Sequence, residues 1–196
     1  MSYEGVKYKT KFVSEIIPED NRIDELRKWC RIFHEKDLAP YYPGGSHGNM
    51  SFRIKKEGDE TFIITAARTN FAEELPREAF FTIHDVDLEK AIVYASGAKN
   101  REASSETMLH YAIYRERPDV MAILHGHCKA ITQNSGIPGI VTTKEFVEPG
   151  TAKVVDSVLE VLDGHNFIEV KDHGFMSLGK SIEEAGKLAM EMLEKV

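Results

Sequence analysis

Two histidines separated by one glycine, His125-Gly126-His127, carry the clearest chemical signal in the sequence. They follow a short apolar run at 120–124, which predicts a buried strand. Side chains at positions i and i+2 of an extended segment point to the same side, so both imidazoles can converge on one metal ion. A catalytic zinc commonly has three protein ligands and one open position, and His173 is the candidate third ligand. Two surface histidines would give the same local pattern, so the spacing alone leaves both readings open.

Glu106 follows two serines, Ser104 and Ser105, where a helix is predicted to begin with Ser105 as its N-cap. The helix dipole stabilises a carboxylate in the first turn, which is enough to explain Glu106. The free N–H groups of the same helix end, together with the two hydroxyls, also form a cradle for an anion. A phosphate bound there would crowd Glu106 unless its carboxylate points away, toward a metal.

A glycine-rich segment at 44–51, GGSHGNMS, interrupts the regular pattern. It lacks the lysine and the spacing of a P-loop, and it does not match the dinucleotide-binding fingerprint GxGxxG. We therefore predict a structural turn in which Asn49 satisfies backbone groups, and we leave the role of His47 undecided.

The other histidines lie in less informative surroundings. His110 is predicted to face the exposed or interfacial side of its helix. Surface placement is predicted for His34, His84 and His165.

The elements that must position these residues follow from the apolar periodicity. Helices are predicted at about 24–37, from Ser105 to Arg117, from Thr151 onward, and from Ser181, where Glu184 completes a capping box. Strands are predicted at 50–54, 61–65, 79–83, 120–124, 167–170 and 174–178, with 55–60 as a hairpin connection. We expect an arm at 1–20, lying on the body of the molecule, and one α/β domain at 21–196.

Composition excludes several classes of protein. The chain has 196 residues, with 32 acidic and 25 basic side chains and a net charge of −7, which argues against a nucleic-acid-binding face. It has no apolar run long enough for a membrane span and no pattern of a secretory signal. Two cysteines are too few for a disulfide scaffold. We expect a cytoplasmic protein without a nucleic-acid or membrane partner.

Four motifs occur in a specific order: Gly48-Asn49-x-Ser51, Ser104-Ser105-Glu106, His125-Gly126-His127 and His173-Gly174. With the segments SSETMLHYAIYRERPDVMAILHGH and VKDHGFMSLGKSIEEA, this order resembles the class II aldolase/adducin family from about residue 22 to the C-terminus. The resemblance implies an α/β fold with a central, mainly antiparallel sheet flanked by helices. It also implies that His125, His127 and His173 bind one Zn²⁺ per chain. Glu106 would be the catalytic acid or base beside the metal.

The same resemblance implies a phosphate site formed by Asn49, Ser104 and Ser105. A further phosphate-binding turn of the family, Thr-x-Thr/Ser-Gly, corresponds here to residues 65–70, TAARTN, which depart from that pattern. Arg68 can replace it, because a guanidinium matches phosphate geometry. On this hypothesis Arg68→Ala raises the KM for a phosphorylated substrate.

Within the family the pattern is most similar to the fuculose-phosphate aldolases. This implies a zinc-dependent, homotetrameric aldolase that reversibly cleaves a ketose 1-phosphate to dihydroxyacetone phosphate and an aldehyde, with zinc stabilising the enediolate. The family's catalytic tyrosine has no counterpart between His127 and His173. The candidate replacements are Tyr41, Tyr42, Tyr111 and Tyr114.

Other reactions are compatible with the same residues, because one fold supports many functions. A dehydratase of the methylthioribulose 1-phosphate type and a pentulose-5-phosphate 4-epimerase would use the same metal ligands and phosphate pocket. Product analysis separates cleavage, water loss and inversion. A non-catalytic, adducin-like module is the alternative from another class, and loss of the metal triad would be its mark.

Overall fold

The computed structural model describes residues 5–54, 60–134 and 136–196. The strands in these ranges are β1 (Lys9–Ser14), β2 (Tyr41–Tyr42), β3 (Gly45–Ser46), β4 (Gly48–Arg53), β5 (Phe62–Thr65), β6 (Phe80–Asp87), β7 (Ile92–Ser96), β8 (Ala122–Gly126), β9 (Val141–Thr142), β10 (Phe167–Val170) and β11 (Gly174–Gly179). The helices are α1 (Arg22–Glu35), α2 (Thr107–Glu116), α3 (Lys129–Thr132), α4 (Ala152–Leu159) and α5 (Ile182–Leu193), with a 3₁₀ turn at Arg77–Ala79.

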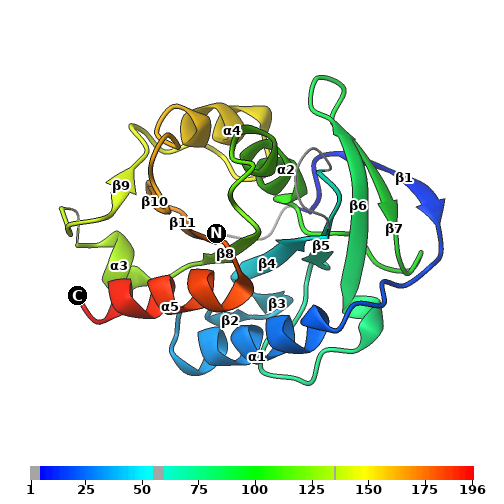
Figure 1. Cartoon of the computed structure of the whole chain (residues 1–196), viewed down its shortest axis with the longest axis horizontal. Helices are drawn as coiled ribbons and strands as arrows, with labels where there is room; N and C mark the ends of the chain where they lie inside the picture. The colour runs from blue at the N-terminus through cyan, green and yellow to red at the C-terminus, as the bar shows by residue number, and fades with distance from the viewer. Residues whose placement is uncertain (1–4, 55–59, 135) are drawn as a thin grey trace.

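Within the described ranges, nine strands form one sheet in the order β1-β7-β6-β5-β4-β8-β11-β10-β9, and β2 pairs with β3 separately. Neighbouring strands are antiparallel except for β1 with β7 and β9 with β10. Helices α2 and α4 cover one face of the sheet, and α1 and α5 cover the other (Figure 1). The expected mainly antiparallel sheet flanked by helices is confirmed.

Both faces of the central strands are buried, which explains why their sequences are apolar without strict alternation. On β8, Ile123 belongs to the core beneath α2 and α4, whereas Leu124 belongs to the core beneath α1 and α5. His125 is two residues after Ile123, so it faces the α2 side. The alternation of side chains along β8 therefore decides on which face a site can form.

The predicted helices are found close to their expected positions. Thr151 directly precedes α4, and Ser181 caps α5 by accepting a hydrogen bond from the backbone N–H of Glu184 at 3.1 Å. The reciprocal half of the capping box differs, because the Glu184 carboxylate accepts from the N–H of Lys180. The predicted strands are also present, but 55–59 of the expected hairpin connection lie outside the described residues.

The start of α2 is a correction to the prediction. The helix begins at Thr107 and not at Ser105, and Glu106 occupies the N-cap position without a side-chain cap. A tight turn precedes the helix, in which the carbonyl of Ser104 accepts hydrogen bonds from both the N–H and the hydroxyl of Thr107. The Ser104 hydroxyl accepts from the N–H of Glu106 at 3.3 Å, so it serves this turn.

The predicted N-terminal arm contributes a strand to the sheet. Strand β1 pairs in parallel with β7 and forms one edge of the nine-stranded sheet. The apolar side chain of Val13 on this strand is exposed. No helix in the described ranges combines the length and apolar character needed to cross a membrane.

Candidate metal centre and active site

Strand β8 lies between β4 and β11, and this pairing brings distant motifs together. Asn49 on β4 is in register with His125, and Met176 on β11 is in register with His125 from the other side. Side chains at paired positions share a face of the sheet. The turn between β10 and β11 places His173 beside the end of β8, because His173 immediately precedes β11.

The three predicted metal ligands converge. One nitrogen from each of His125, His127 and His173 lies within 4.8 Å of the others. The Nε2 atoms of His125 and His127 are 3.0 Å apart. The Nδ1 atom of His125 donates to the carbonyl of Phe175 at 2.8 Å, so its Nε2 lone pair points into the triad. The spacing argument is therefore correct in its geometry.

Gly174 makes this convergence possible. A Cβ atom at Gly174 would lie 2.5 Å from the carbonyl oxygen of Gly126 and 3.0 Å from ring atoms of His125 and His127. These distances are too short for any side chain at this position. The glycine in the His173-Gly174 motif is thus required by the close approach of β11 to β8.

Glu106 lies against the triad and is 4% exposed. Its Oε2 is 2.9 Å from Nε2 of His125, and its Oε1 is 3.5 Å from Nε2 of His173. The side-chain amide of Asn49 donates to Oε2 at 2.8 Å. The carboxylate therefore points toward the histidines, as the crowding argument requires if an anion also binds at this turn.

The charges of the cluster are set by burial and by mutual contact. Burial raises the pKa of Glu106, but His125, His173 and His127 outweigh it and hold that pKa well below its ordinary value. Burial lowers the pKa of His125, and the opposing Glu106 carboxylate raises it above its ordinary value. Burial and neighbouring histidines lower the pKa of His127, and the pKa of His173 falls to about 4.

These residues fit a divalent cation by their chemistry. Glu106 is an anion and two of the imidazoles are neutral, which are the forms that bind a metal. Of the five buried atoms without a hydrogen-bond partner among the described side chains, three belong to this centre: Asn49 Oδ1, Glu106 Oε1 and His173 Nδ1. Three imidazole nitrogens and a nearby carboxylate are a donor set that suits Zn²⁺.

The predicted phosphate contacts differ in their exposure to solvent. Ser104 is buried and Ser105 is half-buried on the same turn. Arg68 is exposed and has a left-handed backbone with φ of 56°. Its backbone packs against Gly45 of the glycine-rich segment, where an added Cβ would lie 2.8 Å from the Arg68 carbonyl carbon. The loop that carries Arg68 therefore lies beside the glycine-rich segment that leads into Asn49 on β4.

His47 is a site residue that the sequence left undecided. Its ring stacks on His127 with centroids 5.1 Å apart, and Tyr42 lies on it at 4.4 Å. Burial lowers the pKa of His47. Of the other candidate tyrosines, Tyr111 donates to Asp85 and Tyr114 bonds to Ser51, whereas Tyr41 is exposed. In the sequence, the glycine-rich segment around His47 was the only indication that this histidine belongs to the site.

His110 is not exposed, contrary to the prediction. It is fully buried because α2 lies between the sheet and α4, with its residues from Thr107 to Tyr114 buried. Its Nδ1 is 2.7 Å from the Ser51 hydroxyl. Burial lowers the pKa of His110 to about 3, a shift that Glu106 opposes and His125 reinforces.

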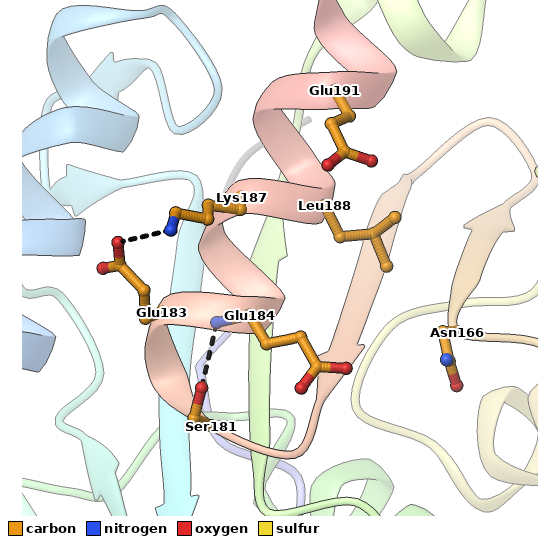
Figure 2. A pocket seen from close by; sticks show the side chains of 7 residues that line it. All are labelled: Asn166, Ser181, Glu183, Glu184, Lys187, Leu188 and Glu191. Carbon is orange, nitrogen blue, oxygen red and sulfur yellow. Dashed lines mark hydrogen bonds and ion pairs between the residues drawn. The ribbon is translucent and has the colours of Figure 1, made fainter.

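A surface groove along α5 lies apart from this centre (Figure 2). It is lined by Asn166, Ser181, Glu183, Glu184, Lys187, Leu188 and Glu191. Lys187 pairs with Glu183 at 3.3 Å, and Ser181 caps the helix. The Lys187–Glu183 ion pair and the Ser181 cap are thus contacts within α5 and its cap that need no ligand. None of the three converging histidines lines this groove.

Comparison with known proteins adds the family. Residues 24–196 match the family described as Class II Aldolase and Adducin N-terminal domain. The chain is 28% identical to an L-fuculose phosphate aldolase of Methanocaldococcus jannaschii over 183 residues, covering 86% of this chain and 89% of the relative. It is 26% identical to a methylthioribulose-1-phosphate dehydratase of Methylococcus capsulatus over 194 residues, covering 85% and 86%. A solved L-fuculose 1-phosphate aldolase superposes with a TM-score of 0.74 at 19% identity, covering 91% of this chain and 84% of that chain, which shows a shared fold.

Proposed function

Because the chain belongs to the class II aldolase and adducin family, we propose that it is a zinc-dependent aldolase that reversibly cleaves a ketose 1-phosphate to dihydroxyacetone phosphate and an aldehyde. The observation that carries the proposal is the contact of a buried, charged Glu106 with two of three converging histidines. A buried charge held by specific partners is typical of sites that keep the charge for chemistry, which favours an enzyme over a non-catalytic module.

In this proposal His125, His127 and His173 hold the metal. The Phe175 carbonyl fixes the His125 ring, and His47 stacks on the outer face of His127. When bound, a divalent cation supplies Lewis acidity, which stabilises negative charge developing on the ketose oxygens. The supporting observations are the convergence of the three nitrogens and the neutral state of two rings.

Glu106 is the proposed acid or base. Its lowered pKa makes it a carboxylate at neutral pH, so it can take a proton from the carbon next to the ketose carbonyl or return one to it. The amide of Asn49 holds Oε2 in place, which limits the orientations of the carboxylate. Oε1 accepts no hydrogen bond and lies 3.5 Å from Nε2 of His173, so it is the oxygen we assign to the proton transfer.

Asn49, Ser104, Ser105 and Arg68 are the proposed phosphate contacts. The serines precede α2, and the arginine follows Ala67, whose N–H donates to the carbonyl of Glu102, so the two segments are neighbours. Phosphate held at one end of the substrate orients the carbon skeleton relative to Glu106. Arg68→Ala is expected to raise the KM for the phosphorylated substrate with less effect on kcat.

Dehydration of a ketose 1-phosphate is the second candidate. It is favoured by the methylthioribulose-1-phosphate dehydratase relative and by the absence of tyrosine from 128–172. Both reactions move a proton at the same carbon, but aldol cleavage breaks the adjacent C–C bond and dehydration breaks a C–O bond. A pentulose-5-phosphate 4-epimerase remains a further reaction type for the same residues.

Product analysis with the zinc-loaded full chain decides between these reactions. We expect L-fuculose 1-phosphate or a related ketose 1-phosphate to release dihydroxyacetone phosphate, detected by a coupled reductase. Loss of water from methylthioribulose 1-phosphate would identify the dehydratase, and inversion of a pentulose 5-phosphate would identify the epimerase. No turnover by protein with bound metal would support the adducin-like module.

We also propose that the protein is a cytoplasmic homotetramer, on the basis of the family resemblance. Light scattering of the purified full chain measures its mass in solution and tests the tetramer.

A further inference from the structure

We propose that Tyr8, which precedes the residues matched to the family, positions the segment from Ala103 to Thr107 that carries the catalytic carboxylate. The inference rests on the function proposed above for Glu106 and its neighbouring serines. It assigns a part in the active site to the N-terminal arm.

The Tyr8 hydroxyl contacts three residues of this segment, Ala103, Ser104 and Thr107. The side chain is buried, with 8% exposure, and its hydroxyl donates to the carbonyl oxygens of Ala103 at 3.0 Å and Ser104 at 2.9 Å. The hydroxyl of Thr107 is 3.3 Å away. One hydroxyl hydrogen is shared between the adjacent carbonyls of Ala103 and Ser104 at the start of the turn. Thr107 lies at its end, so a single side chain contacts both ends of the turn before α2.

The opposite side of the segment is held by the end of β5. The N–H of Ser104 donates to the carbonyl of Thr65 at 3.1 Å, and the N–H of Ala67 donates to the carbonyl of Glu102 at 2.9 Å. The turn thus lies between a fixed strand and Tyr8. Since the N–H of Glu106 donates to the Ser104 hydroxyl, a shift of Ser104 is passed directly to the catalytic carboxylate.

The arm itself is anchored by the sheet. Directly after Tyr8, the N–H of Lys9 donates to the carbonyl of Ala91 at 2.8 Å, and β1 continues alongside β7. Lys7 pairs with Glu148 at 2.5 Å, but both side chains are partly exposed, and such pairs contribute little. The buried hydroxyl of Tyr8 therefore gives the arm a direct contact with the segment that carries Glu106.

Tyr8→Phe in the full chain tests the proposal, because it removes the hydroxyl and keeps the ring that packs in the core. Tyr94→Phe is the matched control, since Tyr94 lies on β7 beside β1 with its ring under Lys11. The readouts are backbone hydrogen exchange, zinc content, and kcat with KM. Loss of a buried hydrogen bond corresponds to about a tenfold change in an equilibrium or a rate.

We expect exchange at the N–H groups of Glu106 and Thr107 to accelerate about tenfold and kcat to fall about tenfold in Tyr8→Phe. Zinc content should stay at the wild-type value, because the three histidines lie outside this segment. Tyr94→Phe should match the wild type in every readout. If wild-type protein turns over no ketose phosphate, the proposed function fails, while the exchange measurement still decides the role of Tyr8.

Two results would overturn the positioning role. The first is an exchange rate at Glu106 and Thr107 that is the same in Tyr8→Phe as in the wild type. Acceleration spread evenly over α2 and β8 counts with it, because that marks general destabilisation. The second is locally faster exchange with an unchanged kcat in an active enzyme.

Discussion

Glu106 holds a negative charge in a place where burial alone would neutralise it. A carboxylate that is 4% exposed loses its hydration, and only the adjacent imidazoles and the Asn49 amide compensate for that loss. Such compensation is typical of sites where a charge is kept for chemistry. The arrangement separates a proton-transfer role from a ligand role, and the two roles predict different mutants.

Glu106→Gln is expected to keep its zinc and to lose about 10²–10⁴-fold in kcat, because a positioned acid or base contributes a factor of this size. Metal analysis and steady-state kinetics measure the two effects. Glu169→Gln is the control, since Glu169 is an equally buried carboxylate that bonds Thr142 on a different part of the sheet. Loss of zinc from Glu106→Gln would instead make Glu106 a metal ligand.

His110 makes the stability of the metal-free fold depend on pH. Burial lowers its pKa from the ordinary 6.5 to about 3, so between these values the unfolded chain binds a proton that the folded chain does not. Stability from this group is therefore complete above pH 6.5 and declines as the pH falls. Glu106 and His125 are the charged groups that act on it.

Urea unfolding at pH 7.5 and 5.5 measures this effect. Wild-type protein is expected to lose about 1.4 kcal/mol more over this interval than His110→Asn, which corresponds to one pKa unit. His165→Asn, an exposed histidine, should behave like the wild type. Equal losses in wild type and His110→Asn would show that this histidine titrates normally in the folded protein.

At the scale of elements, the site is the meeting point of a strand, a hairpin turn and a helix start. Strand β8 carries His125, the turn before β11 carries His173, and the residue before α2 is Glu106. These elements are held from the far side of the sheet by α1 and α5, which pack against each other through Gly186 and Trp29. Packing there supports the strands on which the ligands lie.

Gly186→Ala tests that packing, because two effects compete. Alanine favours a helix over glycine by up to about 1 kcal/mol, but the new Cβ would lie 2.3 Å from atoms of the Trp29 ring. Overpacking costs about 1–3 kcal/mol, so we expect net destabilisation in urea unfolding. Lys187→Ala on the exposed side of α5 should change stability by less than about 0.5 kcal/mol. A stabilised Gly186→Ala would mean that α1 and α5 separate easily.

For the whole molecule, the metal centre joins segments that are far apart in the chain. A metal that binds the folded chain and not the unfolded one stabilises it by about 2.7 kcal/mol at 100 times its Kd. For a chain of this length we expect the thermal midpoint to rise by about 5–10 °C with zinc and to return with a chelator. His173→Ala should abolish the zinc-dependent rise, whereas His84→Ala, at an exposed position of β6, should keep it. A rise of equal size in His173→Ala would place the zinc elsewhere.

The sequence by itself determined the features that depend on residues close together in the chain. Apolar periodicity located α1, α4, α5 and the central strands, and the i, i+2 spacing put His125 and His127 on one face, because strand geometry is local. Weakly patterned or short elements such as β1, β7, β9 and α3 were not predicted, since pairing with neighbouring strands or packing defines them.

Only the tertiary structure decided which surroundings each residue has. The burial of His110, the stacking of His47 on His127 and the contact of Tyr8 with Ser104 join residues from different segments, in the last case 96 positions apart. The charge of Glu106 likewise follows from histidines on other elements. No local pattern encodes these contacts, because they arise where the sheet brings β4, β8, β11 and the start of α2 to one place.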